Sequence, residues 1–267
     1  MKNTIYLFIT ILGLNCFAQS KIDKQTAQIL DEGKMLYKSE MASWYGSDIF
    51  MEKFKEREKI GGYISYNDND VSKCIFFSKD EKPLALCTIS FDNTFKVETA
   101  KTNFEERELT NNEFDLVKMR IKALSIINSD TLYKRYKNSN LNLIPIIKND
   151  ERKVFVITGP TNNGVMLFGN DYVLTFDKNN KLLKQKQIHR SLIPIEFGDK
   201  KEIEASIHSH VLDDLISSTD ICTLMLYGKF ANMKTHIVIS KKYVSIWDFK
   251  KETLVVITKK AFDKMKQ

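Results

Sequence analysis

The spacing of hydrophobic positions in the first part of the chain changes from helical to alternating. Apolar residues recur at intervals of three and four between Lys24 and Met41, which predicts an amphipathic helix. The segments "GGYISYNDND", "KCIFFSKDEKPLALCTISFD" and "TFKVETAK" then alternate between apolar and polar residues and carry turn residues. This pattern is typical of an antiparallel meander. We therefore expect an N-terminal helix on a small antiparallel sheet.

A long central helix is predicted from about residue 111 to about residue 136. Thr110 and Glu113 stand three positions apart, as in a capping box, where each side chain binds the backbone N–H of the other residue. The helix is expected to pack through one apolar stripe, which consists of Phe114, Val117, Ile121 and Leu124.

Alternation returns in the C-terminal part, after "NSNLNLIPIIKNDERK", which we interpret as a connector with Pro145 in an extended stretch. Strands are expected in "KVFVITG", "GVMLFG", "DYVLTFD", "LLKQKQIH", "THIVISKKYVSIWDF" and "ETLVVITKKAF". A short apolar helix, "DICTLMLYG", lies among them and ends at Gly228. The predicted class is α+β with a mainly antiparallel sheet. The two regions, 19–108 and 109–267, form either separate units or one continuous domain.

The first eighteen residues have the layout of a signal peptide. Lys2 is followed by the apolar run "TIYLFITILGL", which is shorter than the roughly 20 residues that a membrane-spanning helix needs. Cys16 and Ala18 place small residues at the −3 and −1 positions, so cleavage is expected between Ala18 and Gln19. Lipidation at Cys16 is the alternative, but Asn15 stands where a lipoprotein acceptor site has Gly, Ala or Ser. We expect an exported protein, periplasmic or secreted, without a transmembrane segment.

Composition adds that the chain is an ordinary globular protein with 43% hydrophobic and 28% charged residues. The formal net charge is +7, but acidic residues are interspersed with the basic ones throughout. The densest basic run, "DKNNKLLKQKQIHR", is interpreted as a strand edge protected by lysine. We therefore predict no nucleic-acid partner.

Three cysteines remain after the predicted cleavage, namely Cys74, Cys87 and Cys222. If the turn between the first two is centred between Asp80 and Glu81, Cys74 and Cys87 face each other within reach of a disulfide bond. The alternative is that both are reduced and act as small hydrophobic residues. Cys222 lies in the apolar helix and is interpreted as a core residue.

The stretch "IHSHVLDDLISSTD", residues 207 to 220, contains the one candidate site. If "ASIHSH" is a strand, His208 and His210 project from the same face, because side chains alternate along a strand. Two imidazoles and the carboxylate of Asp220 form a ligand set that suits Zn²⁺. A water in the fourth position would then be activated for attack on an amide.

These residues resemble the motif of the JAMM (JAB/MPN) metalloproteases, which is His-x-His, seven residues, and then Ser-x-x-Asp. The residues that match in type and order are His208, Ser209, His210, Ser217 and Asp220. The resemblance implies a zinc ion held by the two histidines and the aspartate, and hydrolysis of peptide or isopeptide bonds.

The sequence departs from that motif in three ways. Six residues rather than seven separate His210 from Ser217, and Val211 replaces the usual proline. Thr161 stands where the upstream general acid/base glutamate is expected. The glutamates nearest in sequence to the motif are Glu196, Glu202 and Glu204.

A simpler interpretation of the same letters needs no metal. Ser217 can cap the helix, and Asp220 in its first turn complements the helix dipole. His189 and His236 are interpreted as structural or surface residues. Two functions therefore remain: an exported, non-enzymatic binding module with a protein or envelope component as partner, which we expect, or a divergent zinc-dependent peptidase.

Overall fold

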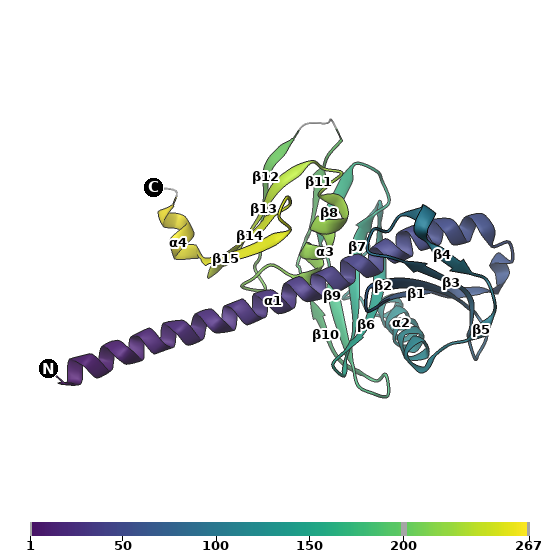
Figure 1. The fold of residues 1–267 in the computed structure, drawn as a ribbon, viewed down its shortest axis with the longest axis horizontal. Coiled ribbons are helices and arrows are strands. Elements are labelled where there is room, and N and C mark those ends of the chain that lie inside the picture. Colours follow the sequence, from purple (N-terminus) through teal and green to yellow (C-terminus); the bar gives the residue numbers. More distant parts are fainter. Residues whose placement is uncertain (1, 199–201, 266–267) are drawn as a thin grey trace.

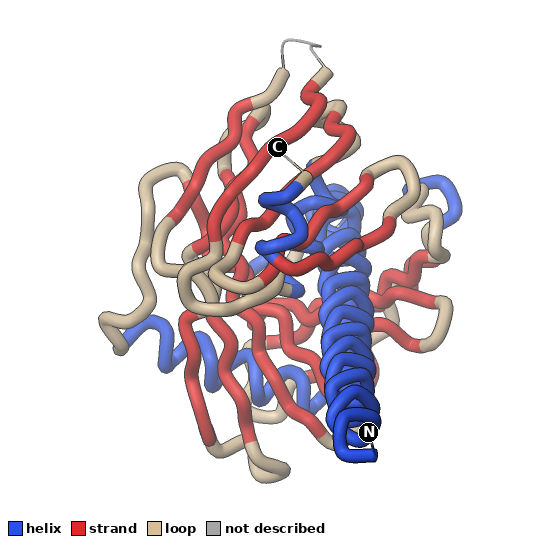
Figure 2. Tube along the Cα trace, turned by 90° about the vertical axis from the view of Figure 1, so that its left-hand side faces the viewer, coloured by secondary structure: helices blue, strands red, loops and turns tan. Residues whose placement is uncertain are grey.

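The structure is a computed structural model that describes residues 2–198 and 202–265, with side chains described from residue 21 onward. It confirms the α+β class with an N-terminal helix and mainly antiparallel sheets. Figure 1 shows helix α1 (Lys2–Lys53) projecting its amino-terminal end away from the sheets. Viewed nearly along its axis, α1 has strands on both sides (Figure 2). No helix in the described residues is both long and apolar enough to cross a membrane.

The predicted signal segment forms the first part of α1, and the side chains of Cys16, Ala18 and Gln19 lie outside the described set. Cleavage after Ala18 therefore stays a prediction. Further along, α1 carries Leu36, Ala42 and Phe50 into the core.

The first sheet is antiparallel and follows α1 directly, as the alternating pattern predicted. Its strands are β1 (Ile60–Asp68), β2 (Val71–Ser78), β3 (Leu84–Phe91), β4 (Lys101–Asn103) and β5 (Arg107–Glu108), with 3₁₀ turns at Arg57–Lys59 and Val97–Thr99. Phe50 of α1 stacks on Phe76 of β2, with ring centroids 3.8 Å apart. The helix thus closes the apolar face of this sheet.

The register of the β2–β3 hairpin differs from the one expected for a Cys74–Cys87 bridge. Cys74 pairs with Ile89, and Cys87 pairs with Phe76, because the turn is centred on Glu81 rather than between Asp80 and Glu81, and the register shifts between Phe76 and Phe77. Both thiols and that of Cys222 are free and buried in the described structure. The cysteines therefore pack as small hydrophobic side chains in the first sheet and in α3.

Helix α2 (Asn111–Ser129) begins with the predicted capping box, in which the Thr110 hydroxyl accepts from the Glu113 N–H and the Glu113 carboxylate accepts from the Thr110 N–H. It ends at Ser129, before the predicted residue 136, and Asp130 is its C-cap. The predicted stripe is wrong at Ile121 and Leu124, which are exposed, whereas Val117 is buried as predicted. The face that packs on the sheets consists of Leu116, Val117, Met119, Ala123 and Ile127.

The second sheet has the order β10-β9-β7-β6. Its strands are β6 (Ser139–Lys148), β7 (Glu151–Pro160), β9 (Tyr172–Phe176) and β10 (Leu182–Gln187), and β8 (Val165–Gly169) pairs separately with β11 (Leu192–Glu196). The expected connector around Pro145 is strand β6. Pro145 fits there because β6 is the edge strand of its sheet, where a missing N–H is tolerated.

The last sheet contains the parallel pair that positions the candidate site. Its strands are β12 (Ile203–Ser209), β13 (Met233–Ile239), β14 (Tyr243–Asp248) and β15 (Thr253–Thr258), followed by α4 (Lys259–Lys264). Strands β12 and β13 are parallel and are joined through α3 (Ser218–Tyr227), because parallel neighbours need a crossover. Helix α3 packs closely on α1: a Cβ added to Gly33 would lie 2.6 Å from Cβ of Ile221.

Candidate metal centre

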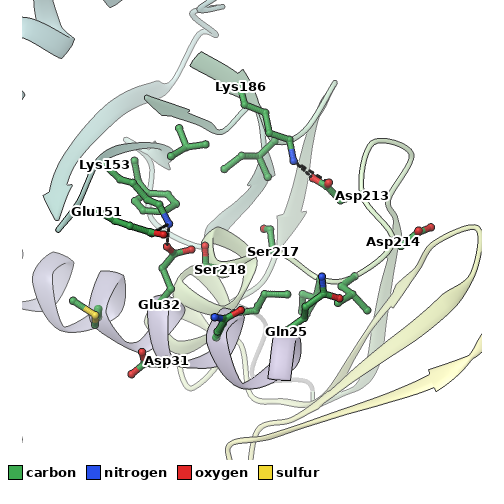
Figure 3. A pocket seen from close by; sticks show the side chains of 18 of the residues that line it. Gln25, Asp31, Glu32, Glu151, Lys153, Lys186, Asp213, Asp214, Ser217 and Ser218 are labelled. Carbon is green, nitrogen blue, oxygen red and sulfur yellow. Dashed lines mark hydrogen bonds and ion pairs between the residues drawn. The ribbon is translucent and has the colours of Figure 1, made fainter. Parts of the chain in front are cut away.

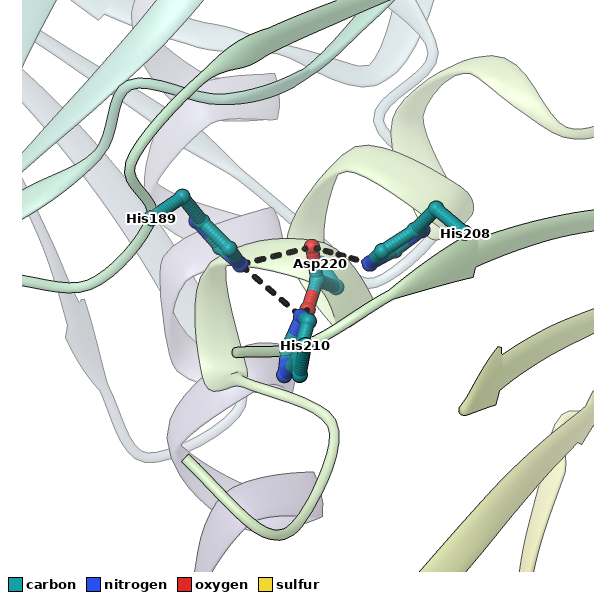
Figure 4. A group of neighbouring side chains, drawn as sticks. All are labelled: His189, His208, His210 and Asp220. Atoms are coloured by element: carbon teal, nitrogen blue, oxygen red, sulfur yellow. Dashed lines mark hydrogen bonds and ion pairs between the residues drawn. The ribbon is translucent and has the colours of Figure 1, made fainter. Parts of the chain in front are cut away.

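The β12–α3 crossover brings the three predicted ligands together. His208 lies near the end of β12, His210 follows the strand, and Asp220 lies in the first turn of α3. The Nε2 atom of His208 is 3.7 Å from Asp220 Oδ1, and Nε2 of His210 is 3.0 Å from Asp220 Oδ2. Both imidazoles point toward the carboxylate (Figure 4). The residues of the motif therefore converge because the end of β12 lies close to the start of α3.

His189 joins these three residues from the connection between β10 and β11. Its Nε2 atom lies 3.4 Å from Asp220 Oδ1 and 3.0 Å from His210 Nε2. One ligand atom from each of the four residues lies within 4.8 Å of all the others. The sequence interpretation placed His189 outside the site, whereas the structure makes it a fourth candidate ligand.

The four residues are buried, and three of their polar atoms have no hydrogen-bond partner among the described residues: His189 Nδ1, and two atoms that face the interior of the cluster. Asp220 is 1% exposed, His208 6%, His210 7% and His189 9%. His208 Nε2 and Asp220 Oδ1 find no hydrogen-bond partner within the described part of the chain. A buried polar group without a partner costs about 1–3 kcal/mol. Two such atoms aimed at one point indicate a site for a cation.

The two oxygens of Asp220 have separate tasks. Oδ2 accepts hydrogen bonds from the N–H and the hydroxyl of Ser217, at 3.0 and 2.8 Å, while the Ser217 hydroxyl accepts from the Asp220 N–H at 3.0 Å. This is a complete capping box. Oδ1 remains directed at His189 and His208. Helix capping and metal binding are therefore compatible uses of the same side chain rather than alternatives.

The Nδ1 atom of His210 has a hydrogen-bond partner, and that of His189 has an ion-pair contact; both contacts leave the opposite nitrogen facing inward. His210 Nδ1 lies 2.7 Å from the carbonyl oxygen of Leu215, and His189 Nδ1 lies 3.3 Å from Asp171 Oδ2. Asp171 is itself held by the Thr158 N–H, which donates to its Oδ1 at 3.0 Å. Carboxylate and carbonyl partners of this kind are the usual supports of metal-binding imidazoles.

The electrostatics of the metal-free cluster make one imidazole neutral and another positively charged at neutral pH. Burial lowers the pKa of His208 to about 4, which leaves its ring neutral and able to bind a metal. Burial also lowers the pKa of His189, but Asp220 and Asp171 outweigh it and raise the value to about 10. Burial raises the pKa of Asp220, and the charges of His189 and His210 bring it well below its usual range. A divalent ion would replace the proton of His189 and balance the two buried carboxylates, Asp171 and Asp220.

The distances also fit a tetrahedral zinc ion. Zinc binds nitrogen and oxygen ligands at about 2.0–2.2 Å, so neighbouring ligand atoms around a tetrahedral ion lie about 3.3–3.6 Å apart. The separations are 3.4 Å from Asp220 Oδ1 to His189 Nε2, 3.7 Å from Asp220 Oδ1 to His208 Nε2 and 3.0 Å between the Nε2 atoms of His189 and His210. All ligand atoms lie within 4.8 Å of one another, so the side chains would adjust slightly on binding the ion. Three nitrogens and one oxygen suit zinc better than calcium or magnesium, which prefer oxygen ligands throughout.

The loop between His210 and Asp220 borders a cavity of about 950 Å³ between α1 and the second sheet. Figure 3 shows Ser217 and Ser218 on one wall of this cavity, and Lys186, which pairs with Asp213 of the loop at 2.7 Å. Leu215, whose carbonyl supports His210, also lines the cavity. The shape of this wall therefore depends on the loop that joins two of the candidate ligands.

The glutamates considered for a peptidase lie away from the cluster. Glu202 and Glu204 are exposed and pair with Lys234 at 3.0 and 2.6 Å, while Glu196 and Thr161 are also exposed. No protein-family model matches the sequence, and comparisons with curated proteins and with solved structures give no significant match. The JAMM resemblance therefore stays confined to the motif, and the case for a metal site rests on the His189–His208–His210–Asp220 geometry.

Proposed function

We propose that this protein binds one zinc ion through His189, His208, His210 and Asp220, and that the ion has a structural role. The observation that carries the proposal is the convergence of four buried ligand atoms. Two of these, His208 Nε2 and Asp220 Oδ1, have no hydrogen-bond partner among the described residues. A zinc ion would satisfy both atoms and balance the charge of the buried carboxylates.

The number of protein ligands favours a structural role over catalysis. Catalytic zinc usually has three protein ligands and keeps one position open for water, whereas structural zinc is enclosed by four. Here His189 occupies the position that a water would take in a peptidase. The burial of all four side chains supports the same conclusion.

The ion would join three parts of the fold that are distant in the chain. His189 follows the second sheet, His208 and His210 belong to the end of β12, and Asp220 begins α3. A metal that binds only the folded arrangement adds its binding free energy to folding. We therefore propose that zinc fixes the last sheet and α3 against the second sheet.

The sequence supports export as the setting of this function, with cleavage between Ala18 and Gln19. We propose that the mature chain is a non-enzymatic module that acquires zinc after export. Its partner would be a protein or another component of the cell envelope.

Elemental analysis of the purified protein tests the proposal. We expect close to one zinc per chain in the parent, and none in the double variant His208→Ala/His210→Ala. Ser209→Ala is the matched control, because Ser209 lies between the two histidines but is exposed. Absence of zinc from the parent, even after zinc is offered, would overturn the proposal.

A further inference from the structure

We infer that His236 is a positioning residue of the metal centre: its Nε2 accepts the proton of His208 Nδ1 and so fixes His208 in the tautomer that offers Nε2 to the metal. The inference rests on the proposed zinc site and adds a residue to it. His236 is fully buried on β13, and its Nε2 lies 2.9 Å from Nδ1 of His208.

The direction of this hydrogen bond follows from what surrounds the two rings. If His236 donated, the proton of His208 would sit on Nε2, which has no acceptor in the described part of the chain and lies 3.7 Å from Asp220 Oδ1. If His208 donates instead, Nε2 carries a lone pair aimed at the centre of the cluster. Only the second arrangement allows His208 to bind the ion together with His189 and His210.

The remaining contacts of His236 agree with this direction of hydrogen bonding. With its Nε2 accepting, the neutral ring carries its proton on Nδ1, which lies 2.6 Å from the hydroxyl oxygen of Ser206. The Ser206 hydroxyl in turn donates to Met233 Sδ at 3.7 Å. Every polar hydrogen in this chain therefore has an acceptor, from His208 through His236 and Ser206 to Met233.

Packing leaves the His236 ring little freedom to turn. It stacks on Phe168 with ring centroids 4.8 Å apart and planes at 9°, and it lies on the strand that pairs with β12. A neutral acceptor also suits the charge of the site. A carboxylate in the place of His236 would be the third one near the ion, after Asp171 and Asp220, and one divalent ion balances only two negative charges. His236 thus has for His208 the role that Asp171 has for His189 and Leu215 for His210.

Zinc affinity, measured by competition with a chromogenic chelator, tests the inference in His236→Phe and His236→Gln. Phenylalanine has no acceptor, and we expect the affinity to fall about 10- to 100-fold. Glutamine can present its carbonyl oxygen near the position of Nε2, so it should recover much of the loss. Ser206→Ala, which removes only the acceptor of His236 Nδ1, should show a smaller loss in the same direction.

Val238→Ala controls for simple destabilisation, because Val238 is 1% exposed on the same strand and its side chain has no polar atom. Its backbone pairs with His208, and alanine keeps that backbone unchanged. The substitution should lower the melting temperature without changing zinc affinity.

Long-range ¹H–¹⁵N spectra of the parent should show His236 protonated at Nδ1 and His208 protonated at Nδ1. Zinc binding in the parent with unchanged affinity in His236→Phe, or the opposite tautomer of His236, would overturn this inference alone. A parent that takes up no zinc would overturn both the inference and the proposed function.

Discussion

Asp220 Oδ1 lies 3.4 Å from His189 Nε2, although the two residues come from the start of a helix and from a connection beside another sheet. The other oxygen of Asp220 is engaged in capping α3 through Ser217. This division of one carboxylate ties the helix start to the connection that carries His189. The centre therefore depends on tertiary packing and on local helix capping at the same time.

Replacement of His189 by alanine should convert a four-ligand site into a three-ligand site. We expect zinc affinity to fall by more than about 100-fold, since even the loss of a residue that only supports a ligand costs about 10- to 100-fold. Competition with a chelator measures this change, and the absorption spectrum of the Co²⁺-loaded protein should report entry of water into the open position. Arg190→Ala is the control, because Arg190 is the exposed neighbour of His189. Equal affinities in the two variants would remove His189 from the ligand set.

Metal removal should lower the thermal stability of the parent. If free zinc exceeds its Kd about a thousandfold, the ion adds roughly 4 kcal/mol, which for a domain of this size corresponds to a melting temperature roughly 8–16 °C higher. Scanning calorimetry with and without EDTA, followed by addition of zinc, measures the shift and its reversal. The variant His208→Ala/His210→Ala should not respond to EDTA. A response of equal size in that variant would show that the chelator acts elsewhere.

The sequence was sufficient for the parts of the site that depend on local spacing. His208 and His210 share a face because strand side chains alternate, and Ser217 and Asp220 are spaced as a helix cap. His189 could not be placed in this way, because its position depends on how β10 and β11 return beside β12. One signal was present: all four histidines of the chain lie between residues 189 and 236.

The contrast between local spacing and tertiary packing also explains where the observed fold differs from the predicted one. Most strands, the capping box at Thr110 and Glu113, and the cap of α3 by Ser217 were predicted, since they follow from short-range patterns; β6, predicted as a connector, is an exception. The pairing of Cys74 with Ile89 depends on the length of the turn and on the register shift after Phe76, which alternation does not specify. The buried face of α2 was predicted at Val117 but missed at Met119, because Ile121 fits the helical period as well as Met119 does, and only the packing partner decides between them.

Stability should decrease at low pH through Glu113, which is buried beside Arg107 at 2.7 Å. Burial raises the pKa of Glu113, but hydrogen bonds from Arg107, Thr110 and Tyr66 outweigh it and bring the value to about 2. A carboxyl whose folded pKa lies below its unfolded value stabilises the fold above the unfolded pKa. This contribution should therefore be lost as the pH falls from about 4.5 to about 2.

Glu113→Gln tests this pH dependence. We expect the variant to lose about 1–3 kcal/mol of unfolding free energy at pH 7 and to show a flatter acid limb in urea titrations. Glu108→Gln is the matched control, because Glu108 also pairs with a cation, Lys82, but both side chains are exposed. An exposed pair contributes little. A similar loss in both variants would contradict the assignment of the effect to the buried network.

Glu40 should have the opposite influence at neutral pH. Burial raises its pKa to about 7, although the amide of Asn142 donates to its carboxylate at 2.9 Å. A carboxyl with a raised folded pKa destabilises the fold once the unfolded state ionises. The unfolding free energy should therefore decrease as the pH rises from about 4.5 to about 7 and then level off.

Urea titrations of the parent at pH 5 and pH 8 should show this decrease in unfolding free energy, and Glu40→Gln, whose side chain stays neutral, should reduce it. Glu52, an exposed residue on the same helix, provides the control variant Glu52→Gln, which should retain the full difference between the two pH values. If Glu40→Gln retains it as well, another group is responsible for the dependence.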